Sequence, residues 1–373
     1  MDKQLTALDV QILQALYDVG PRNLSKVARI VGISRKKLES RIKYMKSDPK
    51  FFLRIYTDIY HTNIGLKKAV VVLKAKPGME QLLFDCLLVN GFWLYVCRSY
   101  GLGEGCTAVY AVPVERCKEF EEFVYEIKRL GVAEDVRIFW STCFQVGHVT
   151  SSWFDGDKEW WVFRWDDWVG DVLAQGTDLP YTLLEVESYP IYADDVDVQM
   201  LMHLEVDATK SIKEIAEVLG ISRQLAQHHY RKHLVGKKLI EGYDIFVMRY
   251  GDVPSVMVLF VVYFSGYEEF AKFANFLLDK FFVLTMGKVL GENALLVEVS
   301  LPFVEFRRFV DFLSGLARMK FVRGYEYFVQ DLRVRRRQSI SGEFFKDGCW
   351  VYEHKKYMAM LWQKVSQFML EFG

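Results

Sequence analysis

The chain of 373 residues lacks several features that would place it in a familiar class of proteins. It has 48 Lys and Arg against 48 Asp and Glu, so no overall charge argues for a nucleic-acid or membrane partner. Its six cysteines include no Cys-x-x-Cys pair, which disfavours a zinc ribbon or a redox dithiol. The longest apolar run, residues 253–264, is too short to cross a bilayer, and no signal peptide begins the sequence. We therefore expect a cytoplasmic protein without a membrane partner.

What the sequence does contain is an internal duplication at a spacing of 188 residues. Residues 27–35, VARIVGISR, return as residues 215–223, IAEVLGISR. One added residue later shifts the spacing to 189, which pairs Pro113 with Pro302. Because the agreement extends without gaps over about a hundred positions, it predicts two similar modules fused into one chain.

The first repeated element has the pattern of a helix-turn-helix. Apolar residues recur at helical spacing between residues 12 and 45, with breaks at Gly20-Pro21 and at Gly32, and Ser34 is a good N-cap for the third helix. Such a helix presents its exposed side chains to base edges and phosphates, unless that face is simply solvated. The predicted DNA-binding residues are Ser34, Arg35, Lys36, Lys37, Ser40, Arg41 and Tyr44, with Ser222, Arg223, Gln224, Gln227, His228 and Arg231 in the second copy.

The two copies differ in charge. Residues 1–50 hold eleven Lys and Arg against five Asp and Glu, a net charge of +6, whereas residues 193–247 hold seven against nine, a net charge of −2. We therefore expect the first copy to contribute most of the affinity for DNA. His228, His229 and His233 could form a metal site or a pH switch, but scattered surface histidines are the simpler interpretation, and no metal is expected.

Each helical element is followed by the same order of predicted elements, a strand, a helix, a hairpin, a helix and a strand. This βαββαβ order is that of a ferredoxin-like unit, and two such sheets could pack face to face within one chain. The predicted fold class is α+β, a tandem repeat of a winged helix-turn-helix followed by a ferredoxin-like domain. The predicted domains are a winged helix at 1–60, a ferredoxin-like unit at 66–145, an aromatic extension and linker at 146–192, a second winged helix at 193–250, a second ferredoxin-like unit at 254–332, and a basic segment with a C-terminal helix at 333–373.

Two further segments have unusual composition. Trp161, Trp165 and Trp168 follow helical spacing, which indicates either the packing face of an added helix or a surface that docks another protein. The run from Arg333 to Arg337 contains four arginines, and it could contact phosphate or an acidic partner or form an exposed loop.

In its order of elements, with Ile33-Ser34-Arg35 in the helical module and a Gly-rich hairpin in the sheet, the chain resembles the Lrp/AsnC family of archaeal and bacterial transcription regulators. The resemblance covers about residues 5–142 and 193–330. It implies DNA binding by the first domain, dimerisation by the second and, in many members, sensing of a small effector. The effector positions that it implies are Gly101, Gly103, Glu104, Gly105, Gly291 and Glu292.

The favoured function is therefore a sequence-specific DNA-binding transcription regulator that is a single-chain pseudo-dimer or a homodimer, and is neither an enzyme nor dependent on a cofactor. Its expected partners are double-stranded DNA and a small effector. One alternative is a tetrapyrrole-modifying decarboxylase, because siroheme decarboxylases also resemble Lrp/AsnC proteins, although Tyr100, His148, His203 and His228 form no recognisable catalytic spacing. Another is a factor that recruits a basal transcription factor or RNA polymerase through its aromatic segments.

Overall fold

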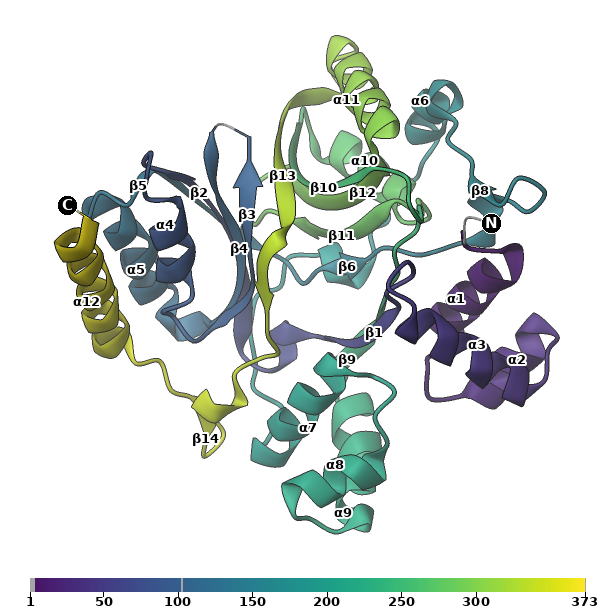
Figure 1. Ribbon diagram of the computed structural model, residues 1–373, viewed down its shortest axis with the longest axis horizontal. Coiled ribbons are helices and arrows are strands. Elements are labelled where there is room, and N and C mark those ends of the chain that lie inside the picture. Colours follow the sequence, from purple (N-terminus) through teal and green to yellow (C-terminus); the bar gives the residue numbers. More distant parts are fainter. Residues whose placement is uncertain (1–3, 102, 373) are drawn as a thin grey trace.

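The computed structural model describes residues 4–101 and 103–372, and its architecture is the predicted α+β arrangement (Figure 1). Two helical modules alternate along the chain with two ferredoxin-like units. Leu102, inside the predicted hairpin turn, lies outside the described residues, as do positions 1–3 and 373 at the ends of the outer predicted domains. No helix in the described part of the chain is both long and apolar enough to cross a membrane.

Each helical module consists of three short helices whose ends follow from local sequence. Thr6 and Asp9 form a capping box at the start of the first helix, and Gly32 ends the second with a φ of +74°. Ser34 then caps the third helix by accepting a hydrogen bond from the backbone N–H of Lys37. The first module comprises α1 (Ala7–Val19), α2 (Leu24–Val31) and α3 (Arg35–Ser47), and the second comprises α7 (Asp195–Val206), α8 (Ile212–Leu219) and α9 (Arg223–His228), which continues as a π-helical turn (His229–Val235).

The two modules share their wing. After α3 the chain forms β1 (Arg54–Ile59), and after the π-helical turn it forms β9 (Ile240–Phe246). These two strands pair antiparallel with each other, with Arg54 opposite Phe246. The wing ribbon is therefore built from both halves of the chain, and it connects the two helical modules below the sheets (Figure 1).

Each ferredoxin-like unit has the predicted βαββαβ order. Helices cover one face of each sheet, and the other face is turned toward the opposite unit (Figure 1). The first unit comprises β2 (Leu66–Ala75), α4 (Glu80–Leu87), β3 (Trp93–Tyr100), β4 (Glu104–Pro113), α5 (Cys117–Arg129) and β5 (Ala133–Ser141). The second comprises β10 (Ser255–Phe264), α10 (Tyr267–Leu277), β11 (Val283–Lys288), β12 (Ala294–Pro302), α11 (Phe303–Arg318) and β13 (Val322–Arg337).

The two sheets meet both face to face and along their edges. Their facing surfaces share a buried cluster in which Val70 and Val72 lie with Leu259 and Val261. At one edge the end of β13 pairs with β3 of the other unit, and at the other edge β6 (Gln145–Val146) pairs with β11. The strand order is β5-β2-β4-β3-β13-β10-β12-β11-β6, so hydrogen bonds join the two units into one continuous sheet.

The segments that follow each unit cross to cover the other unit. The first extension forms the short hairpin of β7 (Phe154–Asp155) and β8 (Trp160–Trp161), followed by α6 (Trp165–Leu173), which packs on α10 and α11. The second forms β14 (Phe345–Lys346), β15 (Cys349–Trp350) and α12 (His354–Phe372), which packs on α4 and α5. Trp161, Trp165 and Trp168 are all buried in the core, so the aromatic stripe is a packing face within the chain.

Candidate functional site

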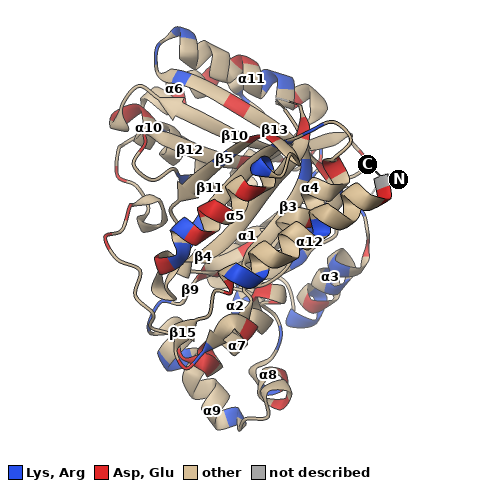
Figure 2. Cartoon of the chain, turned by 90° about the vertical axis from the view of Figure 1, so that its left-hand side faces the viewer, with Lys and Arg blue, Asp and Glu red and all other residues tan. Residues whose placement is uncertain are grey.

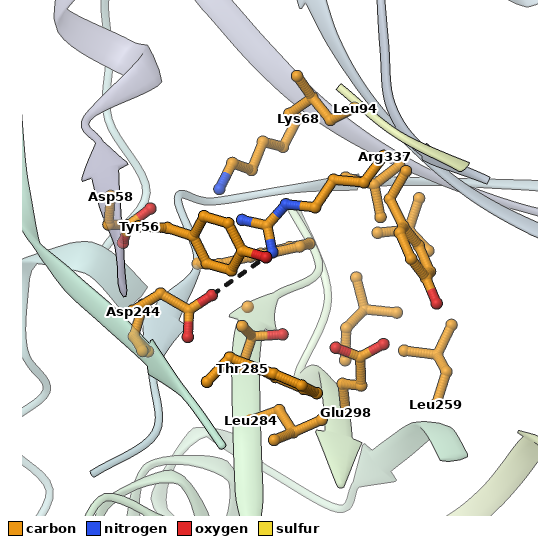
Figure 3. Close-up of a pocket in the computed structure, with 18 of the residues that line it drawn as sticks. Tyr56, Asp58, Lys68, Leu94, Asp244, Leu259, Leu284, Thr285, Glu298 and Arg337 are labelled. Atoms are coloured by element: carbon orange, nitrogen blue, oxygen red, sulfur yellow. Dashed lines mark ion pairs between the residues drawn. The ribbon is translucent and has the colours of Figure 1, made fainter. Parts of the chain in front are cut away.

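A cavity of about 330 Å³ lies where the two halves meet, between the wing ribbon and the joined sheets (Figure 3). Its volume lies in the range of about 300–1,000 Å³ that is usual for small-molecule sites. Residues of β1, β2, β3, β9, β10, β11, β12 and β13 line it. We call it the central cavity.

Three cations line the central cavity. Lys68, on β2, is only 6% exposed, and its ammonium lies 4.3 Å from the centre of the Phe144 ring. Arg337, at the end of β13, places its guanidinium 3.6 Å from the centre of the Tyr56 ring (Figure 3). Arg335 lies two residues earlier on the same strand and lines the cavity as well. Together they form a basic surface suited to carboxylate or phosphate groups.

The cavity also holds carboxyl groups that burial has made weaker acids. Burial raises the pKa of Glu205, at the end of α7, to about 7 and that of Glu298, on β12, to about 6. Burial likewise raises the pKa of Asp58 and of Asp244, although Asp244 lies 3.8 Å from Arg337. Carboxyl groups whose pKa is raised in this way keep a proton to higher pH than ordinary acids and can donate it.

Hydrogen bonds hold part of this polar lining in place. The hydroxyl of Tyr95 donates to Gln330 over 3.0 Å, and the amide of Gln330 donates to Glu298 over 2.9 Å. The backbone N–H of Ile340 donates to Glu205 over 2.7 Å. Because Gln330 and Ile340 come from the segment around the end of β13, this segment positions both acids.

His61 lies at the cavity wall. It is 2% exposed, and neither of its ring nitrogens is hydrogen-bonded to a side chain within the described residues. Burial, together with the nearby charge of Lys68, keeps its pKa well below the ordinary value. The imidazole is therefore neutral and retains a lone pair that can accept a proton or bind a metal.

Equivalent positions of the two repeats differ in charge at four places in the central cavity. At each of them a charged lining residue of one repeat corresponds to an apolar lining residue of the other. The pairs are Asp58 and Phe246, Lys68 and Met257, Arg335 and Val146, and Glu298 and Val109. A homodimer would present two identical half-sites, whereas this chain presents a charged and an apolar residue at these equivalent positions.

The residues predicted to bind DNA lie on α3 and α9, at the N-caps of these helices and, for Arg231, on the π-helical turn. Arg35, Lys36, Lys37 and Ser40 are exposed, and Figure 2 shows basic residues along α3. Arg35 pairs with Glu39 over 2.7 Å. In the second copy Arg223, Gln224, His228 and Arg231 are exposed, Gln227 is half-buried, and Ser222 caps α9.

Two of the predicted DNA contacts have other partners. The guanidinium of Arg41 makes two hydrogen bonds with Asp9, whose side chain is fully buried. Tyr44 is half-buried and packs edge-on against Phe51. The structure therefore assigns both side chains to the packing of the first helical module rather than to a free reading surface.

The predicted effector positions do not line the central cavity. Glu104 pairs with Arg98, and Gly105 approaches the backbone of Leu73 so closely that a Cβ atom would collide with it. Gly103 and Gly105 border a cavity of about 20 Å³, which is too small for an organic molecule. Gly101 lies against Tyr327, and Gly291 and Glu292 border an open hollow beside the ion pair of Glu185 and Lys288.

The sequence interpretation missed most of the central cavity. The arginine run was named, but an exposed loop was a main alternative for it, whereas it forms a strand in which Arg335 and Arg337 line the cavity and Arg336 is exposed. Tyr56, Asp58, His61 and Lys68 were not predicted as site residues. The signal that could have indicated the cavity was Lys68, a charged residue in a strand whose other residues are almost all buried.

No family model and no curated protein matches this chain. Among solved structures, the siroheme decarboxylase NirDL is similar over 98% of this chain and 100% of its own, with 12% identity and a TM-score of 0.56. The same enzyme in co-complex with an iron-uroporphyrin III analogue is similar over 96% of this chain and 98% of its own, with 12% identity and a TM-score of 0.52. The likeness establishes a shared Lrp/AsnC-like fold.

This comparison corrects one expectation. We expected a protein that is not an enzyme, but the solved structure whose fold matches nearly the whole chain is an enzyme. The expectation rested on the absence of a catalytic spacing in the sequence. That spacing was absent because the cavity residues come from strands that are distant in sequence and meet only in the fold.

Proposed function

We propose that the chain is a decarboxylase that acts on a tetrapyrrole with several carboxylate groups, in the manner of the siroheme decarboxylases. The observation that carries the proposal is the central cavity, whose lining combines three cations and carboxyl groups of raised pKa with apolar residues. A flat macrocycle with acidic side chains has the same two kinds of surface. The full-length likeness of fold to siroheme decarboxylase NirDL supports this choice of substrate class.

The cations account for binding. Lys68, Arg335 and Arg337 would pair with substrate carboxylates, and the arginines can do so through two hydrogen bonds each. Arg337 is held against Tyr56 and Asp244, so its guanidinium is already oriented. The neutral imidazole of His61 offers a nitrogen ligand to the iron of the substrate.

The acids account for the chemistry. When an acetate side chain loses CO2, the bond between the carboxylate carbon and its neighbour breaks, and the electron pair remains on that neighbour, which then takes up one proton. No oxidant or reductant is consumed. Burial raises the pKa of Glu205 to about 7 and that of Glu298 to about 6, so Glu205 is partly protonated near neutral pH and Glu298 in mildly acid solution, and these two are the proposed proton donors.

The apolar residues of the cavity would assist the same step. A carboxylate placed among Val109, Val146 and Met257 loses hydration, whereas the CO2 that it becomes carries no charge. Desolvation therefore destabilises the reacting carboxylate more than the product. Carboxylates that are retained would instead lie against the cations.

The proposal can be tested first by binding. Siroheme added to the purified chain without oxygen should change its visible absorption and saturate at one molecule per chain. Arg337→Met should weaken this binding by about 5-fold, as expected for the loss of one charged contact at a partly exposed position. Arg336→Met is the matched control, since Arg336 is also exposed on the same strand but does not line the cavity, and it should bind as the wild type does. Equal affinities for all three proteins would contradict the assignment of the cavity.

A DNA contact through the first helical module is a second candidate, and it could coexist with enzymatic activity. The observation that favours it is the exposure of Lys36, Lys37 and Ser40 on α3. Lys36→Ala together with Lys37→Ala should then lower the affinity for duplex DNA and reduce its dependence on salt. Arg223→Ala with Gln224→Ala, in the less basic second module, should have the smaller effect. If the chain has no measurable affinity for duplex DNA at low salt, this candidate is wrong.

A further inference from the structure

The second helical module brings two histidines and two aspartates together at the start of α7. His229 Nδ1 lies 2.8 Å from Asp197 Oδ1 and 3.6 Å from Asp194 Oδ1. His233 Nδ1 lies 3.0 Å from Asp197 Oδ2 and 3.4 Å from Asp194 Oδ2. The four ligand atoms all lie within 4.8 Å of one another. From the sequence we expected scattered surface histidines, but His229 and His233 instead cluster around the fully buried carboxylate of Asp197.

We propose that Asp194, Asp197, His229 and His233 form a binding site for a divalent transition metal ion, with zinc as the best fit. Two ligands at about 2.0–2.1 Å from a tetrahedral zinc ion stand about 3.3–3.4 Å apart. The nitrogen–oxygen distances of 2.8–3.6 Å in the cluster bracket that separation. Two carboxylates and two neutral imidazoles would also neutralise the ion.

The first helical module shows why the cluster calls for a cation. Asp9, the counterpart of Asp197, is equally buried and is neutralised by Arg41. The position of Arg41 is taken by His229 in the second module, and Thr6 and Met45 correspond to Asp194 and His233. The second copy has thus replaced one permanent cation by imidazoles and added a second carboxylate. All ion pairs of Asp194 and Asp197 found among the described residues are with histidine.

The carboxylates are already oriented by the backbone. Asp194 accepts a hydrogen bond from the backbone N–H of Asp197 over 2.9 Å, and Asp197 accepts one from that of Asp194 over 3.1 Å. This capping box fixes both side chains and leaves an oxygen of each directed toward the histidines. The histidines are four residues apart on the π-helical turn, which places both rings on one side, with centroids 4.6 Å apart.

A bound ion would tie the start of α7 to the helix that follows α9. The other end of α7 carries Glu205, which lines the central cavity. The ion would therefore stabilise the element that positions one proposed proton donor, but the metal site itself does not depend on the proposed decarboxylase activity. It rests on the cluster geometry and on the contrast with the first module.

The test is metal binding by the full chain after dialysis against a chelator. Zinc should bind at one ion per chain in competition with a coloured chelator and should raise the thermal unfolding temperature. Cobalt(II) at the same site should give the intense visible absorption of tetrahedral coordination. His233→Ala, which removes a half-buried ligand, should weaken zinc binding by at least about 100-fold, since loss of a supporting contact alone costs up to that much.

Two further variants make the result specific. His229→Arg installs the arrangement of the first module, so it should fold, pair with Asp197 and bind no zinc. His203→Ala removes a histidine of α7 that contacts Lys210 and not the cluster. This variant should bind zinc as the wild type does. The absence of stoichiometric zinc in the wild type, or unchanged affinity in His233→Ala, would show that the cluster is only a set of histidine–carboxylate pairs and would overturn the proposal.

Discussion

Arg41 and His229 occupy equivalent positions in the two helical modules, and each binds the fully buried aspartate of its own first helix, Asp9 or Asp197. The scaffold has thus been kept while the partner of its buried charge has changed. The same kind of divergence gives four charged residues of the central cavity an apolar counterpart in the other repeat. Duplication supplied two copies of each position, and the two copies no longer have to serve the same role.

The Arg41–Asp9 pair predicts that two arginines of α3 contribute differently to the free energy of unfolding. Arg41→Ala leaves the carboxylate of Asp9 buried without its cation, so the free energy of unfolding should fall by about 2–4 kcal/mol. Arg35→Ala removes only an exposed pair with Glu39, and it should cost less than about 0.5 kcal/mol. Urea denaturation followed by circular dichroism measures both, and equal losses would contradict the structural role of Arg41.

The pKa of Glu205 predicts how stability depends on pH. Its pKa is about 7 in the folded chain and about 4.5 when unfolded, so the folded state binds more protons between these values. The stabilisation is therefore fully present below pH 4.5 and is lost as the pH rises through 7. Glu205→Gln should remove this dependence and, at pH 8, unfold with a free energy higher than that of the wild type by on the order of 1–3 kcal/mol. Parallel pH profiles for the two proteins would show that Glu205 is not the titrating group.

The crossed packing of the tails predicts that α6 stabilises the opposite half. Trp168 is fully buried against Phe276 and Phe282, so Trp168→Ala should cost about 3–5 kcal/mol of unfolding free energy. Leu173→Ala, at an exposed position of the same helix, should change it by less than about 0.5 kcal/mol. A small effect of Trp168→Ala would indicate that α6 is not a stable part of the core.

The cations of the cavity predict that two lysine variants differ in catalytic turnover. Lys68→Met should lower kcat/KM for a carboxylated tetrapyrrole by about 30-fold or more, because a buried cation that meets a substrate carboxylate is lost. Lys67→Met is the control, since Lys67 lies on the other face of the same strand, near Trp140. If both variants turn over at the same rate, the basic surface of the cavity is not used by the substrate.

Much of the fold could be predicted from the sequence because its signals are local. Gly32 and Ser34 mark helix boundaries, and the order of strands and helices follows from periodicity and turns. The pairing of β1 with β9, the crossing of the tails and the extension of β13 onto β3 could not be predicted. These features depend on contacts between residues more than a hundred positions apart.

The cavity escaped prediction for the same reason. Lys68, Glu205 and Arg337 come from three separate regions of the sequence, and no spacing rule relates them. Likewise, three nearby histidines gave no sign that two of them face Asp197, because that contact depends on how α7 packs against the π-helical turn. Function was therefore inferred from the family resemblance, which favoured regulation, whereas the decarboxylase that we propose rests on the geometry of the cavity.

The most direct test of the proposed function is the mass of siroheme recovered after incubation with the chain in deuterated buffer without oxygen. The proposal predicts that each product molecule has lost one or more CO2 and has gained one deuteron for each CO2 lost, because the proton comes from solvent through the cavity acids. It also predicts that Glu205→Gln with Glu298→Gln slows the loss of CO2 while siroheme still binds. Recovery of siroheme with its mass unchanged, despite saturating binding to the wild-type chain, would contradict it.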